Sequence, residues 1–217
     1  MRIIIFANGV IAHPEVEAAR WIRAGDLVIA ANGGTAHALA AGILPDHVIG
    51  DQDSLTEAQR SRLADVTFHA HPPAKDETDL ELALLWAAEV ARTQSPKAAI
   101  IILGALGGRP DQTLANLLLL SLSALRGLDA RIADGPWTCR LARGGESLCF
   151  HGAPGDTLSL IPLGGAAHGI TTEGLEFPLN GETLDFGPAR GVSNAFTGEV
   201  ATISVVEGLL WCFHERG

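Results

Sequence analysis

The segment AIIILGALGGRPDQTLAN, residues 99–116, decides the fold class of this chain. Its first five residues are apolar and mostly β-branched, which is typical of a buried strand. A glycine-rich turn follows, and the next residues predict a helix over residues 112–126 that ends at Gly127. A strand that passes through a tight turn into a helix is the repeating unit of a parallel sheet.

The same alternation runs through the first part of the chain. Further apolar runs predict strands at residues 2–6, 27–31, 47–49 and 66–69. A helix is predicted over residues 79–92, with Thr78 as its N-cap and Glu81 completing a capping box, and Ser54 with Glu57 offers another such box. We therefore expect residues 1–135 to form an α/β domain whose mainly parallel sheet is flanked by helices.

The pattern changes after Asp134, where Gly135 and Pro136 end the last of these units. No helix is evident beyond this point, and short alternating runs separated by turns predict strands at residues 158–163, 169–179, 182–186 and 199–213. We expect residues 136–217 to form a small all-β sandwich or barrel domain.

Composition excludes several classes of function. With 47% hydrophobic and 18% charged residues, the 217-residue chain can bury a sizeable core. Its formal net charge of −10 repels a phosphate backbone, so we expect no nucleic-acid partner. Cys139, Cys149 and Cys212 are odd in number and lack CxxC spacing, which indicates neither a disulfide framework nor a zinc site. No apolar stretch has the length of a signal core or a membrane span, so we expect a cytoplasmic protein with no membrane partner.

Aspartates lie next to glycines at the expected carboxyl ends of strands, where parallel sheets bind ligands. In IGDQDSL, residues 49–55, Asp51 and Asp53 project to the same side if the chain is extended. Two carboxylates about 5 Å apart repel by about 3 kcal/mol at an effective dielectric constant of 20, which a cation offsets. The alternative is an Asx turn in which Ser54 caps the next helix.

A second acidic cluster lies in PAKDETDLELAL, residues 73–84. Asp76 and Asp79 are three residues apart at a helix start, where the helix dipole favours negative charge. Acidic residues in a first helical turn are also ordinary dipole partners, so this cluster has a purely structural alternative. Lys75 adds a cation where a phosphate can lie.

Two glycine-rich loops complete the pattern. In GALGGRPDQTLAN, residues 104–116, Arg109 can make a forked contact with phosphate, and Asp111 lies next to the helix. In ANGGTAHAL, Gly33 and Gly34 suit a nucleotide close to the backbone. Each loop taken alone can be a simple turn, and no Walker motif is present. Together the clusters predict an acidic crevice for a magnesium-bound polyphosphate.

The motifs ANGGTAHAL, PDHVIGDQDSL, KDETDLELAL and GALGGRPDQTLAN, in this order, resemble those of the thiamine pyrophosphokinase (thiamine diphosphokinase) family. GVSNAFTGEVATIS followed by EGLLW near the end extends the resemblance to nearly the whole chain. It implies a kinase that transfers pyrophosphate from ATP to thiamine, giving thiamine diphosphate and AMP. It also implies a domain that binds ATP and Mg²⁺, a β domain that completes the thiamine pocket, and a homodimer with active sites between subunits.

The resemblance also implies roles for particular residues. The magnesium ligands would be Asp51, Asp53 and Asp79. The ATP-binding residues would be Asn32, Gly33, Gly34, Lys75, Thr78 and Arg109. The catalytic residues would be Asp111, Asp79 and Asp76, with Asp111 as the favoured base. The thiamine-binding residues would be Gln112, Ser193 and Asn194.

One position departs from the family pattern, because the usual ADGG reads ANGG, with Asn32 in place of an aspartate. Two alternative functions stay open at this point. One is a magnesium-dependent phosphotransferase that acts on a different alcohol. The other is a thiamine or nucleotide sensor without catalytic turnover, and Asn32 is the residue that motivates it.

Overall fold

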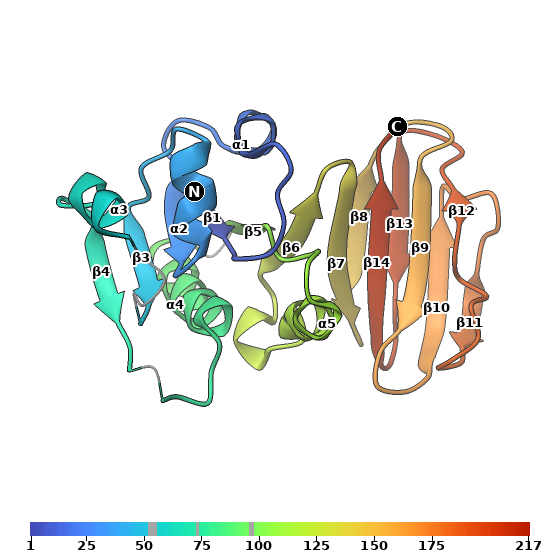
Figure 1. Cartoon of the computed structure of the whole chain (residues 1–217). Coiled ribbons are helices and arrows are strands. Elements are labelled where there is room, and N and C mark those ends of the chain that lie inside the picture. Colours follow the sequence, from blue (N-terminus) through green and yellow to red (C-terminus); the bar gives the residue numbers. More distant parts are fainter. Residues whose placement is uncertain (52–55, 73, 96–97) are drawn as a thin grey trace. The chain divides into compact units, whose positions relative to one another are not determined.

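The computed structural model describes residues 1–51, 56–72, 74–95 and 98–217 (Figure 1). The predicted metal ligand Asp53 and the predicted cap Ser54 lie outside these residues. The chain divides into two compact units, Met1–Gly135 and Pro136–Gly217.

The first unit contains a parallel sheet with the strand order β6-β5-β1-β2-β3-β4. Its strands are β1 (Arg2–Phe6), β2 (Leu27–Ala31), β3 (His47–Gly50), β4 (Thr67–Ala70), β5 (Ala99–Leu103) and β6 (Asp129–Asp134). The apolar runs that predicted β1, β2 and β5 match these strands, because each run is buried on both faces of the sheet.

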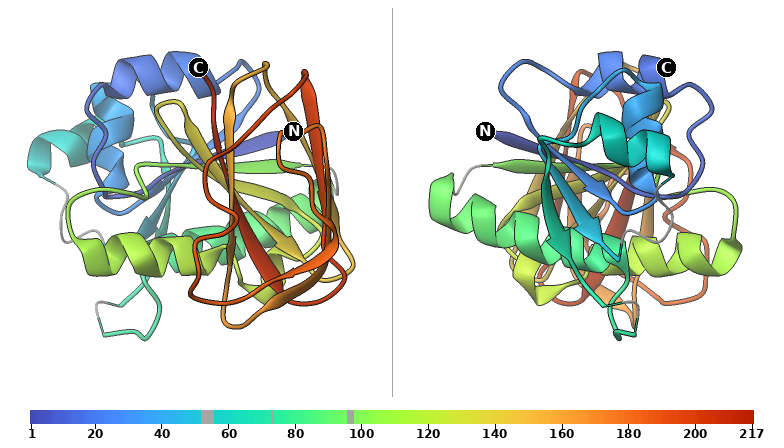
Figure 2. Two further views of the ribbon diagram at one scale, coloured as in Figure 1. Left: turned by 90° about the vertical axis from the view of Figure 1, so that its right-hand side faces the viewer. Right: turned by 60° about the vertical axis from the view of Figure 1, so that its left-hand side comes forward.

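Helices cover both faces of this sheet (Figure 2). They are α1 (Pro14–Trp21), α2 (Gly34–Ala40), α3 (Glu57–Arg62), α4 (Asp79–Gln94), α5 (Pro110–Leu119) and the 3₁₀ turn η1 (Ser123–Leu125). On one face, Ala38 of α2 packs against Ile4 and Phe6 of β1. On the other face, α4 contacts β2 and β3. Among the described helices, none is both long enough and apolar enough to cross a membrane.

The helix termini show where local sequence decides the structure. Helix α4 starts after Thr78 as predicted, because the Thr78 hydroxyl accepts a hydrogen bond from the Glu81 N–H at 3.1 Å. Of the predicted capping box, the structure of these described residues shows this half, without the return bond from the Glu81 side chain. Helix α3 starts with a capping box of Thr56 and Gln59. The single helix predicted over residues 112–126 is wrong in its second half, since α5 ends at Leu119 and tighter turns with i to i−3 bonds follow.

The second unit is a small antiparallel β domain with two sheets, β12-β9-β14-β7 and β11-β10-β13-β8. Its strands are β7 (Trp137–Arg143), β8 (Ser147–His151), β9 (Thr157–Pro162), β10 (Ala167–Glu173), β11 (Asn180–Leu184), β12 (Asn194–Ala195), β13 (Val200–Ser204) and β14 (Leu209–Glu215). Leu160 and Leu210 of one sheet share a core with Phe150 and Ile203 of the other. The predicted fold class, an α/β domain followed by a small β domain, is confirmed.

The three cysteines of the β domain differ in their surroundings. Cys139 and Cys212 are buried, whereas Cys149 on β8 is exposed, and all three are free thiols. Burial raises the pKa of the Cys212 thiol to about 12 and also raises that of Cys139.

A buried histidine lies in the core of the β domain. The ring of His214 stacks on Phe196 with a centroid distance of 4.8 Å, and its Nε2 is 3.4 Å from Oδ2 of Asp156. Asp156 also accepts hydrogen bonds from the N–H groups of Ala153 and Gly217. The two side chains therefore connect β14 to the loop that precedes β9.

Gly34 provides a test of the packing between α2 and β1. A Cβ atom at this position would lie 2.0 Å from the Phe6 carbonyl oxygen, which belongs to the buried backbone of β1. We expect Gly34→Ala to lower the free energy of unfolding by about 3 kcal/mol, as measured by urea denaturation. Gly198→Ala is the matched control, because a Cβ there meets nothing within 4 Å. An equal effect of the two substitutions would contradict this account.

The stability of the protein should fall as the pH drops below about 6.5, the ordinary pKa of histidine. Burial lowers the pKa of His214, and the hydrogen bond that its ring donates to Asp156 only partly opposes this. The folded chain thus binds fewer protons at His214 than the unfolded chain does below that pH. We expect His214→Gln to reduce the loss of urea midpoint between pH 7.5 and 5.5, and an unchanged loss would rule out His214 as its source. Some loss should remain, because burial also lowers the pKa of His47.

Candidate functional site

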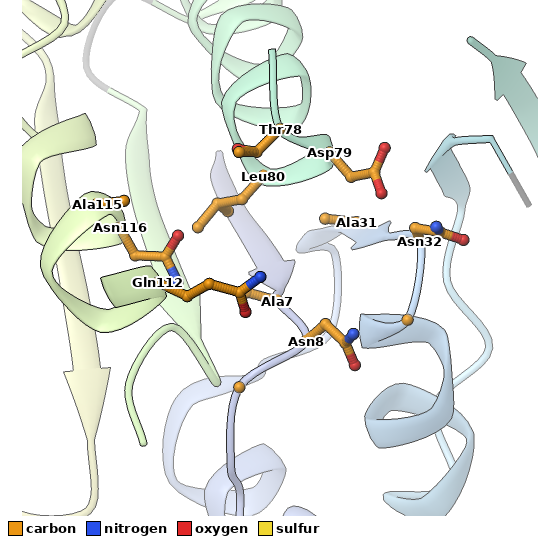
Figure 3. Close-up of a pocket in the computed structure, with 12 residues that line it drawn as sticks. Ala7, Asn8, Ala31, Asn32, Thr78, Asp79, Leu80, Gln112, Ala115 and Asn116 are labelled. Carbon is orange, nitrogen blue, oxygen red and sulfur yellow. The ribbon is translucent and has the colours of Figure 1, made fainter. Parts of the chain in front are cut away.

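The carboxyl ends of β1 and β2 open into a pocket of about 150 Å³ beside the first turns of α4 and α5 (Figure 3). The residues that line it are Ala7, Asn8, Gly9, Ala31, Asn32, Gly33, Thr78, Asp79, Leu80, Gln112, Ala115 and Asn116. Small-molecule sites typically enclose about 300–1,000 Å³, so this pocket can hold only part of a nucleotide.

Glycines allow the segments around this pocket to approach one another. A Cβ atom on Gly33 would lie 2.4 Å from the Asn8 side chain, and one on Gly9 would lie 2.5 Å from the Gly104 carbonyl oxygen. At Gly34 the same space is taken by the backbone of β1. The paired glycines of ANGG therefore have a packing role of their own, and only Gly33 also lines the pocket.

The acidic part of the site is built around Gly50, which has a φ of 143°. A Cβ atom here would lie 2.8 Å from Cβ of Asn32 and 2.8 Å from Oδ1 of Asp79. The side chains of Asp79 and Asn32 thus pack against the backbone of Gly50 at the end of β3, in the space that a side chain at residue 50 would fill. The Asn32 amide in turn donates a hydrogen bond of 2.8 Å to Oδ1 of Asp51, the next residue after Gly50.

Lys75 neutralises Asp79 in this structure. Its Nζ lies 2.6 Å from Oδ1 of Asp79, and the two side chains are 11% and 23% exposed. Asp79 lines the pocket, so the Lys75 ammonium contacts a residue of the pocket wall although Lys75 does not line the pocket itself. Partial burial makes the pair stronger than an exposed one, since water screens the charges less.

Arg109 and Asp111 form a second ion pair, outside the pocket lining. The guanidinium donates from Nε to Oδ1 at 3.1 Å and from Nη2 to Oδ2 at 2.5 Å. This hydrogen-bonded pairing lowers the pKa of Asp111 and raises that of Arg109. A carboxylate held in this way is a weak base, so the pair must open before Asp111 can accept a proton readily.

The remaining predicted residues of the first unit fall into three groups. Gln112 and Thr78 line the pocket, although the Thr78 hydroxyl is also occupied as the cap of α4. Asp76 is exposed and does not line the pocket. Asp53 lies outside the described residues.

Ser193 and Asn194 belong to the β domain. Ser193 is exposed and has a φ of 60°, and its N–H donates a hydrogen bond to Oγ of Ser159. Asn194 is buried, and its side chain bonds both the N–H and the carbonyl oxygen of Phe177. Asn194 also borders a cavity of about 310 Å³ within the β domain, beside Leu160, Phe177 and Arg190. Its amide thus holds the segment around Phe177, between β10 and β11, beside that cavity.

Three polar or glycine residues of the pocket were missed by the sequence analysis: Asn8, Gly9 and Asn116. Asn8 and Gly9 follow the first strand as Asn32 and Gly33 follow the second, so the repeated Asn-Gly pair was the available signal. Asn116 lies four residues after Gln112, on the same face of α5. Its amide donates a hydrogen bond of 2.7 Å to the carbonyl oxygen of Ala105 and fixes the preceding loop.

The donor set suits a hard cation. Carboxylate and amide oxygens are the ligands that Mg²⁺ prefers. Asp51 follows the end of β3, and the carboxylate of Asp79, from the start of α4, lies beside Gly50 there. Within the described ranges, no group of three His, Cys, Asp or Glu side chains is close enough to hold a metal ion. Mg²⁺ usually needs only one or two carboxylates together with substrate phosphates and water, so the residues present fit it.

Two family models match this chain. The model described as thiamin pyrophosphokinase, catalytic domain, matches residues 18–130. The model described as thiamin pyrophosphokinase, vitamin B1 binding domain, matches residues 149–210. The two matches fall in the α/β unit and the β unit, respectively.

Individual proteins agree with these models. The thiamine pyrophosphokinase of Bacillus subtilis is 33% identical over 186 residues, which cover 85% of each chain. A crystal structure of the Bacillus subtilis enzyme superposes with a TM-score of 0.85 at 29% identity, covering 100% of this chain and 99% of the other. For the enzyme from Geobacillus thermodenitrificans the TM-score is 0.83 at 26% identity, with 100% and 98% covered. This chain belongs to the thiamine pyrophosphokinase family.

Proposed function

We propose that this protein transfers a pyrophosphoryl group from ATP to the hydroxyethyl oxygen of thiamine, giving thiamine diphosphate and AMP. The observation that carries the proposal is the convergence of Asp51, Asp79 and Lys75 at the end of β3, beside a pocket bordered by Asn8 and Gln112. Alternating acidic and basic groups beside glycine-rich turns suit a metal-bound triphosphate.

The nucleotide would bind at the carboxyl ends of β1 and β2. Its phosphates would meet the ammonium of Lys75 and the guanidinium of Arg109, while Asn32, Gly33 and Thr78 border the adjoining pocket. Asp51 and Asp79, with Asp53, would hold Mg²⁺. When bound, Mg²⁺ supplies positive charge that neutralises the phosphate oxygens.

The reaction would be an attack of the thiamine hydroxyl oxygen on the β-phosphorus. A new O–P bond forms there, the bond from that phosphorus to the α,β-bridging oxygen breaks, and AMP leaves with the electron pair. A carboxylate accepts the hydroxyl proton. Asp111 would take this role once Arg109 turns to the phosphates, since the present pair holds its pKa low. Asp76 would orient the nucleotide.

The thiamine-binding residues would be Gln112, Ser193 and Asn194. Gln112 already faces the pocket (Figure 3). Asn194 would act mainly by shaping its surroundings, because its amide is bonded to Phe177.

We further propose that two chains form a homodimer and that both active sites lie between subunits. Leu114 and Leu118 on α5 support the dimer, because they are 54% and 40% exposed. The same holds for Phe177 and Phe186 of the β domain, at 65% and 63%. The cytoplasmic location stays a prediction.

Asp79→Asn tests the proposed reaction. The substitution removes the charge that faces both Lys75 and the pocket, so we expect AMP release from ATP, Mg²⁺ and thiamine to fall about 100-fold or more. The variant should still fold, because the amide keeps the shape of the side chain, although its unfolding midpoint should fall somewhat since Lys75 loses its ionic partner. Asp65→Asn, at an exposed position, is the control and should keep full activity.

The outcomes separate the rival functions. Wild-type AMP release by Asp79→Asn would remove this residue from the mechanism. AMP release that needs an alcohol other than thiamine would indicate a different phosphotransferase. Heat release on mixing ATP, Mg²⁺ and thiamine without AMP would indicate a sensor.

A further inference from the structure

Asn32 holds an unusual backbone conformation directly after β2. Its φ is 39°, one of two positive values at described residues other than glycine. The residue is buried, with only 7% of its surface exposed. The Asn32 N–H donates a hydrogen bond of 2.8 Å to the Ile49 carbonyl oxygen. Asparagine and aspartate tolerate this left-handed region better than most residues do. The backbone alone therefore does not explain why an amide stands here.

The side-chain contact does explain it. Nδ2 of Asn32 donates to Oδ1 of Asp51 at 2.8 Å. An aspartate at residue 32 has no proton to donate at neutral pH, and its oxygen would face the Asp51 oxygen across the same gap. Two such carboxylates repel unless a cation or a proton lies between them.

The neighbouring acid has a donor of its own. Asp79 touches the same glycine, Gly50, that Asn32 touches, and it is paired with the Lys75 ammonium. The two described aspartates at the end of β3 are thus each bonded to a donor supplied by the chain. An added charge at residue 32 would disturb this balance, because it would lie next to Asp51 and close to Asp79.

We propose that Asn32, which lines the pocket, is the positioning residue for Asp51: its amide holds this carboxylate at the end of β3 in the absence of a divalent cation. The effect that we expect on the unfolding midpoint follows from the hydrogen bond between Asn32 and Asp51 and does not depend on the proposed function. The effect that we expect on activity rests also on the proposed function, in which Asp51 is a metal ligand. A chain with aspartate at this position would need the cation to assemble the same crevice.

The test compares Asn32→Asp, Asp51→Asn and the double exchange Asn32→Asp with Asp51→Asn. Thermal unfolding is measured in EDTA and again in 10 mM magnesium chloride, with sodium chloride of equal ionic strength as the control for screening. We expect Asn32→Asp to lose several degrees of midpoint in EDTA and to regain most of it with magnesium only. The double exchange should recover the midpoint in EDTA, because an amide again faces a carboxylate.

A purely steric role would give a different result. Asn32→Asp conserves size and shape, so a midpoint in EDTA equal to that of the wild type would overturn the proposal. A double exchange no more stable than Asn32→Asp would also overturn it. Asn180→Asp adds the same charge at an exposed position and should change neither midpoint.

An activity measurement separates this inference from the proposed function. Asn32→Ala should raise the magnesium concentration for half-maximal AMP release about tenfold, with a much smaller change in kcat at saturating magnesium. An unchanged magnesium requirement would contradict the positioning role. If the wild type releases no AMP while the unfolding pattern holds, the proposed function fails and the role of Asn32 in assembling the crevice stands.

Discussion

Close approach of backbone at the carboxyl ends of β1, β2 and β3 is the constraint on which the rest of the α/β unit depends. Gly34 leaves no space between α2 and the Phe6 carbonyl oxygen, and Gly50 lies directly against Asn32 and Asp79. A side chain at either position would push apart the segments that supply the pocket. The apolar β-branched strands bury the sheet, but the glycines determine how near the polar side chains come to one another.

Each of the described aspartates Asp51, Asp79 and Asp111 accepts a hydrogen bond from a side chain of the protein. Asp51 accepts from Asn32, Asp79 from Lys75, and Asp111 from Arg109. Each bond relieves repulsion that the acidic loops would otherwise carry. Ligand binding is then an exchange of partners, in which a cation or a phosphate replaces a donor or an acceptor of the protein.

Local patterns in the sequence were sufficient for strands β1 to β5, the Thr78 cap and the order of the two units, because burial and capping act over a few residues, but they missed β6. They failed where tertiary contacts decide: α5 ends at Leu119 instead of continuing to Arg126. The first two strands of the β unit went unpredicted, and the run over residues 199–213 is two strands separated by a turn. In the site, spacing identified residues near strand ends, but it could not show that Asp111 pairs with Arg109 or that Asn8 borders the pocket.

The unequal surroundings of the three thiols have a practical consequence. An alkylating dye reacts with the thiolate form of a cysteine. Cys139 and Cys212 are both buried in the β domain, and the pKa of Cys212 is raised to about 12, so neither offers an accessible thiolate. Cys149 is exposed, so mild labelling of the folded protein attaches a single fluorophore to β8. The natural sequence thereby offers one spectroscopic handle on the β domain without any engineered cysteine.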